Sequence, residues 1–206
     1  MIAIIDYDAG NIKSVEKAMI SLGENVVITR DPEVILGADG VILPGVGSFG
    51  DAMEKLHAYK LVEVIRQCVE KETPFLGICL GLQLLFESSE ESPGVEGLHI
   101  LDGKIVRIPE QHGIKVPHIG WNDLAYPNKG RLFAGLPENS YVYFVHSYYL
   151  QAEDESIVTA TTEYSTTIHA SVEKGNVFAC QFHPEKSSEV GMKILHNFIQ
   201  ITKNKE

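Results

Sequence analysis

The sequence predicts an α/β fold: a mostly parallel central sheet with helices on both faces and an antiparallel extension. Short, wholly apolar segments alternate with amphipathic segments through the first half of the chain, as in parallel sheets that are covered on both faces. Strand-like segments joined by turns dominate the second half. No proline- or serine-rich linker separates the halves, so we expect residues 1–206 to form a single domain.

The elements of the first half follow from apolar spacing. Strands are expected at residues 2–6, 26–28, 41–43 and 73–78, and helices over 12–22, from Pro32, over one long stretch from about 53 to 68, and from Leu80. Gly23 is well placed to end the first helix, and Asp31-Pro32 has the pattern of an N-cap followed by a proline at the first helical position.

The second half changes to strands with short connections. They are expected at residues 105–108, 141–150, 157–162, 167–172 and 177–182, with a hairpin turn at 173–176. A final helix over about 189–201 should bury Met192, Leu195, Phe198 and Ile199. Trp121 lies in a stretch poorly suited to a strand, and for this side chain a core position and an interface position are equally good interpretations.

Composition excludes several classes of function. The formal net charge of -11 argues against a nucleic-acid or anionic-membrane surface. Three cysteines without a CxxC pair form neither a disulfide framework nor a zinc site. We therefore expect free thiols, no metal and no cofactor. The sequence has neither the basic start of a signal peptide nor about 18 consecutive apolar residues, so the expected location is the cytoplasm.

The segment Gly77-Ile78-Cys79-Leu80-Gly81 has the pattern of a sharp strand-to-helix turn that exposes a nucleophile. Only glycine tolerates the crowding two residues to either side of such a turn. Cys79 would lie beside a helix N-terminus, where the helix dipole favours the thiolate. A buried, inert thiol is the usual alternative, and it suits Cys68 and Cys180, which lack flanking glycines.

A thiol nucleophile needs a base, and the base needs a group that orients it. Phe182-His183-Pro184-Glu185 supplies both, because side chains two apart in an extended segment point the same way. His183 can take the Cys79 proton and later donate it to a leaving amine. The developing oxyanion needs donors: the Leu80 N–H is one, and the loop Gly45-Val46-Gly47 is expected to supply the second. Phosphate binding by this loop is disfavoured, since the phosphate-loop lysine is missing.

These residues resemble the class I, or triad-type, glutamine amidotransferase family, through PGVG at 44–47, GICLGLQ at 77–83 and QFHPE at 181–185. The resemblance covers nearly the whole chain and implies a flavodoxin-like sheet. It also implies that the cysteine forms a γ-glutamyl thioester and releases ammonia from glutamine. The residues it assigns to substrate binding are Gly45, Gln83, His146, Ser147 and Tyr148.

Two further segments, 5–18 and 115–122, are similar to family members that feed ammonia to a separate (β/α)₈-barrel cyclase subunit in histidine biosynthesis. Asp8-Ala9 departs from the small or apolar residues common in that subfamily. The resemblance implies a heterodimer in which Trp121 and Asn122 face the cyclase and Lys186 pairs with an acidic residue of the partner.

Three alternatives remain open at this point. The chain could serve another synthase, for anthranilate, aminodeoxychorismate or purines. It could be a free-standing γ-glutamyl hydrolase, which would cleave γ-glutamyl peptides without a partner. It could also be a redox-sensing module in which Cys79 only oxidises, although this would leave His183 and Glu185 without a role.

Overall fold

The structure, a computed structural model, describes residues 1–204. Its elements in chain order are β1 (Ile2–Ile5), α1 (Ile12–Ser21), β2 (Val26–Thr29), α2 (Pro32–Leu36), β3 (Gly40–Leu43), α3 (Phe49–Ala58), α4 (Leu61–Glu70), β4 (Phe75–Ile78), α5 (Leu80–Leu84), β5 (Ser88–Ser89), β6 (Gly103–Arg107), β7 (His118–Asp123), β8 (Tyr141–His146), β9 (Tyr148–Ala152), β10 (Val158–Glu163), β11 (Thr167–Lys174), β12 (Val177–Cys180) and α6 (Ser188–Lys203). Short 3₁₀ turns lie at Arg131–Phe133, Glu155–Ile157 and Pro184–Lys186.

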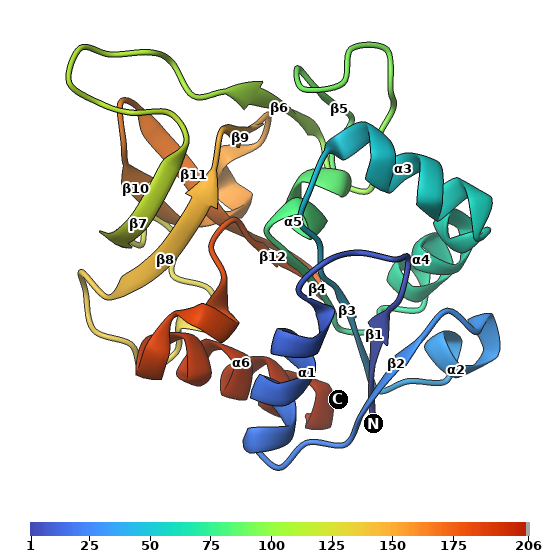
Figure 1. Ribbon diagram of the computed structural model, residues 1–206. Helices are drawn as coiled ribbons and strands as arrows, with labels where there is room; N and C mark the ends of the chain where they lie inside the picture. Colours follow the sequence, from blue (N-terminus) through green and yellow to red (C-terminus); the bar gives the residue numbers. More distant parts are fainter. Residues whose placement is uncertain (205–206) are drawn as a thin grey trace.

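The strands of the described chain form two sheets (Figure 1). The larger has the order β2-β1-β3-β4-β12-β11-β9-β6-β5, with β10 paired to β11, and β7 pairs with β8 in a separate two-stranded sheet. The five strands from β2 to β12 are parallel neighbours, and β12, β11, β9 and β6 continue as antiparallel pairs. The predicted mostly parallel sheet with an antiparallel extension is confirmed.

Helices cover both faces of the parallel strands, and alternation along each strand decides which side chain meets which layer. Ile2 and Ile4 pack with α1 and α6 on one face. Ala3 and Ile5 pack with α2 to α5 on the other. Figure 1 shows α1 and α6 on the opposite side of the sheet from α3 and α4. Within the described chain, no helix is long and apolar enough to cross a membrane.

Several local signals of the sequence are confirmed. Asp31 caps α2 by accepting from the Glu33 N–H, with Pro32 as the first helical residue. Gly23 follows α1 with a positive φ of 80°. Lys174 pairs with Val177, so Gly175-Asn176 closes the predicted hairpin between β11 and β12. Cys68 and Cys180 are fully buried free thiols.

The prediction of one long helix over about 53–68 is wrong, since α3 ends at Ala58 and Lys60 adopts a left-handed φ of 57° before α4. An unbroken helix over 49–70 would be about 33 Å long. The strands beneath have four residues each and span only about 13 Å. The turn at Lys60 reverses the chain between α3 and α4. The apolar faces of both helices therefore pack over the same short strands, in one layer of the core.

Two expectations about strands are also wrong. The segment 141–150 is divided at Ser147, because β8 pairs with β7 in the small sheet whereas β9 pairs with β6 and β11 in the large one. The segment around Trp121 is the regular strand β7. In addition, β12 ends at Cys180 rather than at 182, and Met192 is only partly buried in α6.

Candidate active site

Cys79 lies at the junction of β4 and α5, in a strained backbone conformation with φ 54° and ψ −109°. The flanking glycines allow this turn. A Cβ atom on Gly77 would lie 2.7 Å from the carbonyl oxygen of Gly81, and a Cβ atom on Gly81 would lie 1.9 Å from that of Leu43. Both approaches are shorter than carbon and oxygen tolerate, so the backbone can close here only with glycine. The predicted elbow is confirmed.

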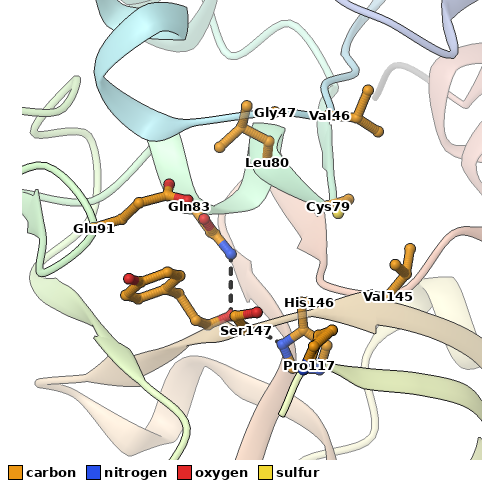
Figure 2. Close-up of a pocket in the computed structure, with 11 residues that line it drawn as sticks. Val46, Gly47, Cys79, Leu80, Gln83, Glu91, Pro117, Val145, His146 and Ser147 are labelled. Carbon is orange, nitrogen blue, oxygen red and sulfur yellow. Dashed lines mark hydrogen bonds between the residues drawn. The ribbon is translucent and has the colours of Figure 1, made fainter.

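Figure 2 shows the pocket of about 350 Å³ into which Cys79 faces. Most of the substrate and oxyanion residues expected from the sequence line it: Val46, Gly47, Leu80, Gln83, His146, Ser147 and Tyr148. Gly45 lies one residue before this lining. Cys79 itself is only 7% exposed and belongs to the lining of this pocket.

His183 and Glu185 meet beside the cysteine. The imidazole Nδ1 donates to Glu185 Oε1 at 2.7 Å, and their side chains are 1% and 0% exposed. The two residues are not in one extended segment as expected, because Pro184–Lys186 forms a 3₁₀ turn. His183 itself is extended, and Pro184 follows it. The turn brings the carboxylate back to the ring, so the predicted pair forms by a different backbone route.

Backbone contacts fix the position of the imidazole. The N–H of His183 donates to the carbonyl of Tyr143 in β8 at 3.0 Å, and its carbonyl accepts from Ser187 Oγ at 2.6 Å. The opposite ring nitrogen, Nε2, is buried and has no hydrogen-bond partner among the described residues. Nε2 is therefore the nitrogen left to exchange a proton with the neighbouring thiol.

The electrostatics favour a proton on His183. Burial lowers the pKa of the imidazole, but the Cys79 sulfur and the Glu185 carboxylate outweigh burial and raise that pKa to about 9. An imidazolium held between a sulfur and a carboxylate is an acid that can protonate a leaving amine. The three side chains thus have the chemistry of a nucleophile, an acid–base and an orienting group.

The oxyanion donors are arranged differently from the expectation. The Leu80 N–H does not face an open site, because it donates to the carbonyl of Gly45 at 3.3 Å. The Val46 side chain is 40% exposed. Gly47 has a φ of 107°, which side-chain-bearing residues rarely adopt, and nothing lies near its missing Cβ. The loop Gly45-Val46-Gly47 thus accepts the hydrogen bond of one expected oxyanion donor, the Leu80 N–H, and has space to change conformation.

Gln83 lines the pocket, and the fully buried Gln181 connects it to Cys79. Gln83 Nε2 donates to the Tyr148 carbonyl and to Gln181 Oε1, each at 3.1 Å. Gln181 Nε2 in turn lies 3.7 Å from the Cys79 sulfur. Because both partners of Gln83 Nε2 are oxygen acceptors, its amide nitrogen is held inward and its Oε1 is left for the pocket.

The sequence analysis missed several residues of this site. Asn11 Nδ2 donates to the same Glu185 oxygen as His183 does, Gln181 contacts the nucleophile, and Glu91 lines the pocket while accepting from the Phe49 N–H at 2.8 Å. Gln181 is the first residue of the QFHPE motif, where it was given no role, and Asn11 follows Gly10 at the start of α1 with a left-handed φ of 67°, which asparagine tolerates. Glu91 has no comparable local signal.

The residues expected at a partner interface lie outside the pocket. Trp121 is 53% exposed on β7 and touches Tyr143 edge to face, with ring centroids 6.1 Å apart. The core interpretation of Trp121 is therefore wrong. Asn122 points to the other side of the strand and donates to the Glu163 carbonyl at 3.0 Å. Lys186 is exposed at the end of the 3₁₀ turn that carries Glu185.

Comparisons with known proteins show the family of the chain. The family model "Glutamine amidotransferase class-I" matches residues 3–201. The chain is 52% identical over 203 residues to the imidazole glycerol phosphate synthase subunit HisH of Moorella thermoacetica, covering 98% of this chain and 96% of the relative. It is 46% identical to subunit HisH 1 of Methanococcus maripaludis, covering 98% and 100%.

Among solved structures, a crystal structure of a glutamine amidotransferase superimposes with a TM-score of 0.76. It covers 98% of this chain and 100% of its own, at 19% sequence identity. At that identity the likeness shows a shared fold, and the chemistry is argued from the side chains themselves.

Proposed function

Because the chain belongs to the class-I glutamine amidotransferase family, we propose that it is the glutaminase subunit of imidazole glycerol phosphate synthase. It hydrolyses L-glutamine to L-glutamate and ammonia. It delivers the ammonia to a cyclase subunit, which makes imidazole glycerol phosphate and aminoimidazole carboxamide ribotide in histidine biosynthesis. The assignment to histidine biosynthesis is supported by HisH relatives that are 52% and 46% identical over nearly the whole chain. The contact of His183 with Glu185 beside Cys79 is the observation that carries the chemistry.

The reaction proceeds through a thioester. With the Cys79 proton on His183, the sulfur attacks the side-chain amide carbon of glutamine. The tetrahedral intermediate collapses with cleavage of the C–N bond, and His183 gives its proton to the departing nitrogen, so ammonia leaves. Water, deprotonated by the same imidazole, then attacks the thioester carbon and releases glutamate. Glu185 keeps the ring oriented through Nδ1 and balances its charge.

The oxyanion site is completed by a rotation in the loop, which is our hypothesis for how the subunit is switched on. Turning the peptide between Gly45 and Val46 withdraws the Gly45 carbonyl from the Leu80 N–H and points the Val46 N–H into the site. Two donors then face the developing charge, with Gly47 absorbing the backbone change. The present contact between Leu80 and Gly45 is the motivation for this step.

Glutamine binds with its amino-acid end away from Cys79. A substrate ammonium group needs acceptors, and Gln83 Oε1 and the Glu91 carboxylate supply them at the pocket wall. Backbone groups of His146, Ser147 and Tyr148 contact the same end of the substrate. The pocket volume of about 350 Å³ suits one small amino acid.

The partner docks on the side of the small sheet. We propose that Trp121 and Asn122 face the cyclase, that Lys186 pairs with one of its acidic residues, and that residues 1–206 act as a single domain in a cytoplasmic heterodimer. A docked acceptor is chemically sensible, because ammonia released into water at neutral pH becomes mostly ammonium, which is not a nucleophile.

The test is a glutaminase assay on the chain alone, with the cyclase, and with the cyclase plus its nucleotide substrate. We expect strong glutamate release only in the third mixture. Stimulation by a different synthase would reassign the pathway to another amidotransferase. Efficient cleavage of γ-glutamyl peptides by the chain alone would instead indicate a hydrolase. A wild-type chain that forms no thioester in any mixture would overturn the enzyme assignment.

A further inference from the structure

Two buried histidines outside the catalytic group touch each other. His118, at the start of β7, and His146, at the end of β8, are 3% and 6% exposed. His118 Nδ1 lies 3.0 Å from His146 Nε2. Buried polar groups of this kind are costly unless each finds a partner. The catalytic steps described above use neither ring, so their placement calls for another explanation.

The surrounding groups fix the direction of every hydrogen bond in this pair. His146 Nδ1 lies 2.9 Å from the Tyr148 carbonyl, which can only accept, so His146 carries its proton on Nδ1. Its Nε2 must then accept, and the donor is His118 Nδ1. The remaining nitrogen, His118 Nε2, is an acceptor and faces Asn122 Nδ2 at 3.5 Å.

Both rings are held neutral and rigid. Burial lowers the pKa of His118 to about 4. Burial also lowers the pKa of His146, to about 3, against the raising effect of the Tyr148 carbonyl. His118 is stacked on Tyr164 and on Phe144, with ring centroids 3.8 and 4.7 Å away. The rings therefore hold one tautomer each and have little freedom to rotate.

The bridge ends at the carbonyl that also orients Gln83. The Tyr148 oxygen accepts from His146 Nδ1 at 2.9 Å and from Gln83 Nε2 at 3.1 Å. Figure 2 shows these two hydrogen bonds as dashed lines meeting at one carbonyl. A continuous chain of donors and acceptors thus runs from Asn122 on the small sheet, through both imidazoles, to Gln83 in the pocket lining.

We propose that His118 and His146 form an uncharged bridge that positions Gln83 for substrate binding, with His118 as a positioning residue. His118 touches no substrate and acts through His146. The bridge starts on β7, the strand that also carries the exposed Trp121. A partner bound to this strand would therefore contact the element that holds the first hydrogen bonds of the bridge. This inference rests on the proposed glutaminase function.

The bridge should affect binding of glutamine more than the chemical step, since it reaches Gln83 and not the contact between His183 and Glu185. The substitution His118→Phe keeps a flat ring between Tyr164 and Phe144 but removes both nitrogens. The substitution His118→Asn places an amide N–H near the position of Nδ1 and gives up the stacking. Together they separate hydrogen bonding from packing.

The test measures KM and kcat for glutamine with the stimulated complex of the full chain and cyclase. We expect His118→Phe to raise KM by about tenfold, which corresponds to ~1.4 kcal/mol, with kcat within about twofold. His118→Asn should recover part of the loss in KM. The control is His169→Phe: His169 Nδ1 accepts from the Ala152 N–H at 3.2 Å outside the pocket, so KM should be unchanged.

An unchanged KM in His118→Phe would overturn the proposal. An equal increase in KM in His118→Phe and His118→Asn would also overturn it, because the asparagine amide should restore part of the binding. A second measurement is independent of activity. Long-range ¹H–¹⁵N correlation spectra of the wild-type chain should show His118 and His146 both protonated at Nδ1 at neutral pH. Protonation of either at Nε2 would contradict the bridge, whereas a wild-type chain inactive in all mixtures would contradict the proposed function alone.

Discussion

The backbone N–H of Leu80 donates to the carbonyl oxygen of Gly45 at 3.3 Å. One of the two groups that an oxyanion needs is therefore already bound to the loop that should supply the other. The nucleophile, the imidazole and the pocket are in place, but the donor site is closed. In this conformation we expect slow turnover, because loss of one oxyanion donor alone costs about a hundredfold or more in rate.

The first prediction concerns Gly47, whose φ of 107° disfavours any side chain. Gly47→Ala should restrict the loop and reduce partner-stimulated glutaminase activity by about tenfold or more, on the scale of a misplaced donor. Gly23→Ala is the matched control, because Gly23 has a φ of 80° with open space around its missing Cβ and lies at the far end of α1. The two variants should lose similar stability in thermal melts. Equal activity in both would refute the loop hypothesis.

A second prediction separates glutamine chemistry from ammonia use. Cys79→Ala should lower glutamine-dependent synthesis by at least about a thousandfold, because no other group can form the thioester. Synthesis from ammonium salts by the same complex should continue at the wild-type rate. Cys68→Ala, a buried position in α4, should keep glutamine-dependent activity and lose only about 1 kcal/mol of stability. Loss of both activities in Cys79→Ala would contradict the division of labour between subunits.

The raised pKa of His183 predicts a pH profile. This imidazole loses its proton as the pH rises through about 9, so kcat/KM for glutamine should fall on the alkaline side near that value. Glu185→Gln removes one of the effects that raise this pKa, and the alkaline limb should move to lower pH. The same group stabilises the fold below the ordinary imidazole pKa near 6.5, and that contribution is lost as the pH passes about 9. An alkaline limb at the same pH in both proteins would contradict the assignment.

Partner docking can be tested with two exposed apolar side chains. Trp121 and Ile20 are 53% and 55% exposed, on β7 and α1. Trp121→Ala should weaken binding to the cyclase by about tenfold or more, since an aromatic anchor carries a large share of an interface. Ile20→Ala should leave the calorimetric Kd unchanged. Comparable losses would place the interface elsewhere.

The parallel half of the fold is predictable from sequence because its signals are local. Wholly apolar four-residue strands such as β1, the Asp31 cap and the glycines beside Cys79 each fix their own geometry. The break at Lys60 is not predictable in this way, because the length of the sheet beneath decides where the helix must turn. Nor is the division at Ser147, since it depends on which strands pair on each side.

The candidate site follows the same rule. Cys79, His183 and Gln83 lie in motifs that can be recognised from the residues next to them in the sequence. By contrast, the buried contact of His118 with His146 spans 28 residues, and Asn11 reaches Glu185 across 174 residues. Contacts of this range depend on how whole strands are placed, which neither spacing nor composition reports. The closed oxyanion donor likewise depends on a single peptide orientation.

Cys79 is held by the large sheet alone, whereas His183 follows β12 of that sheet and is also hydrogen-bonded to the two-stranded sheet. The bond to the two-stranded sheet joins the His183 N–H to the carbonyl of Tyr143. A sub-ångström shift of the two-stranded sheet relative to the large sheet would consequently change the distance over which the proton passes between Cys79 and His183. A molecule that binds the outer surface of the two-stranded sheet would then change the turnover rate without entering the pocket.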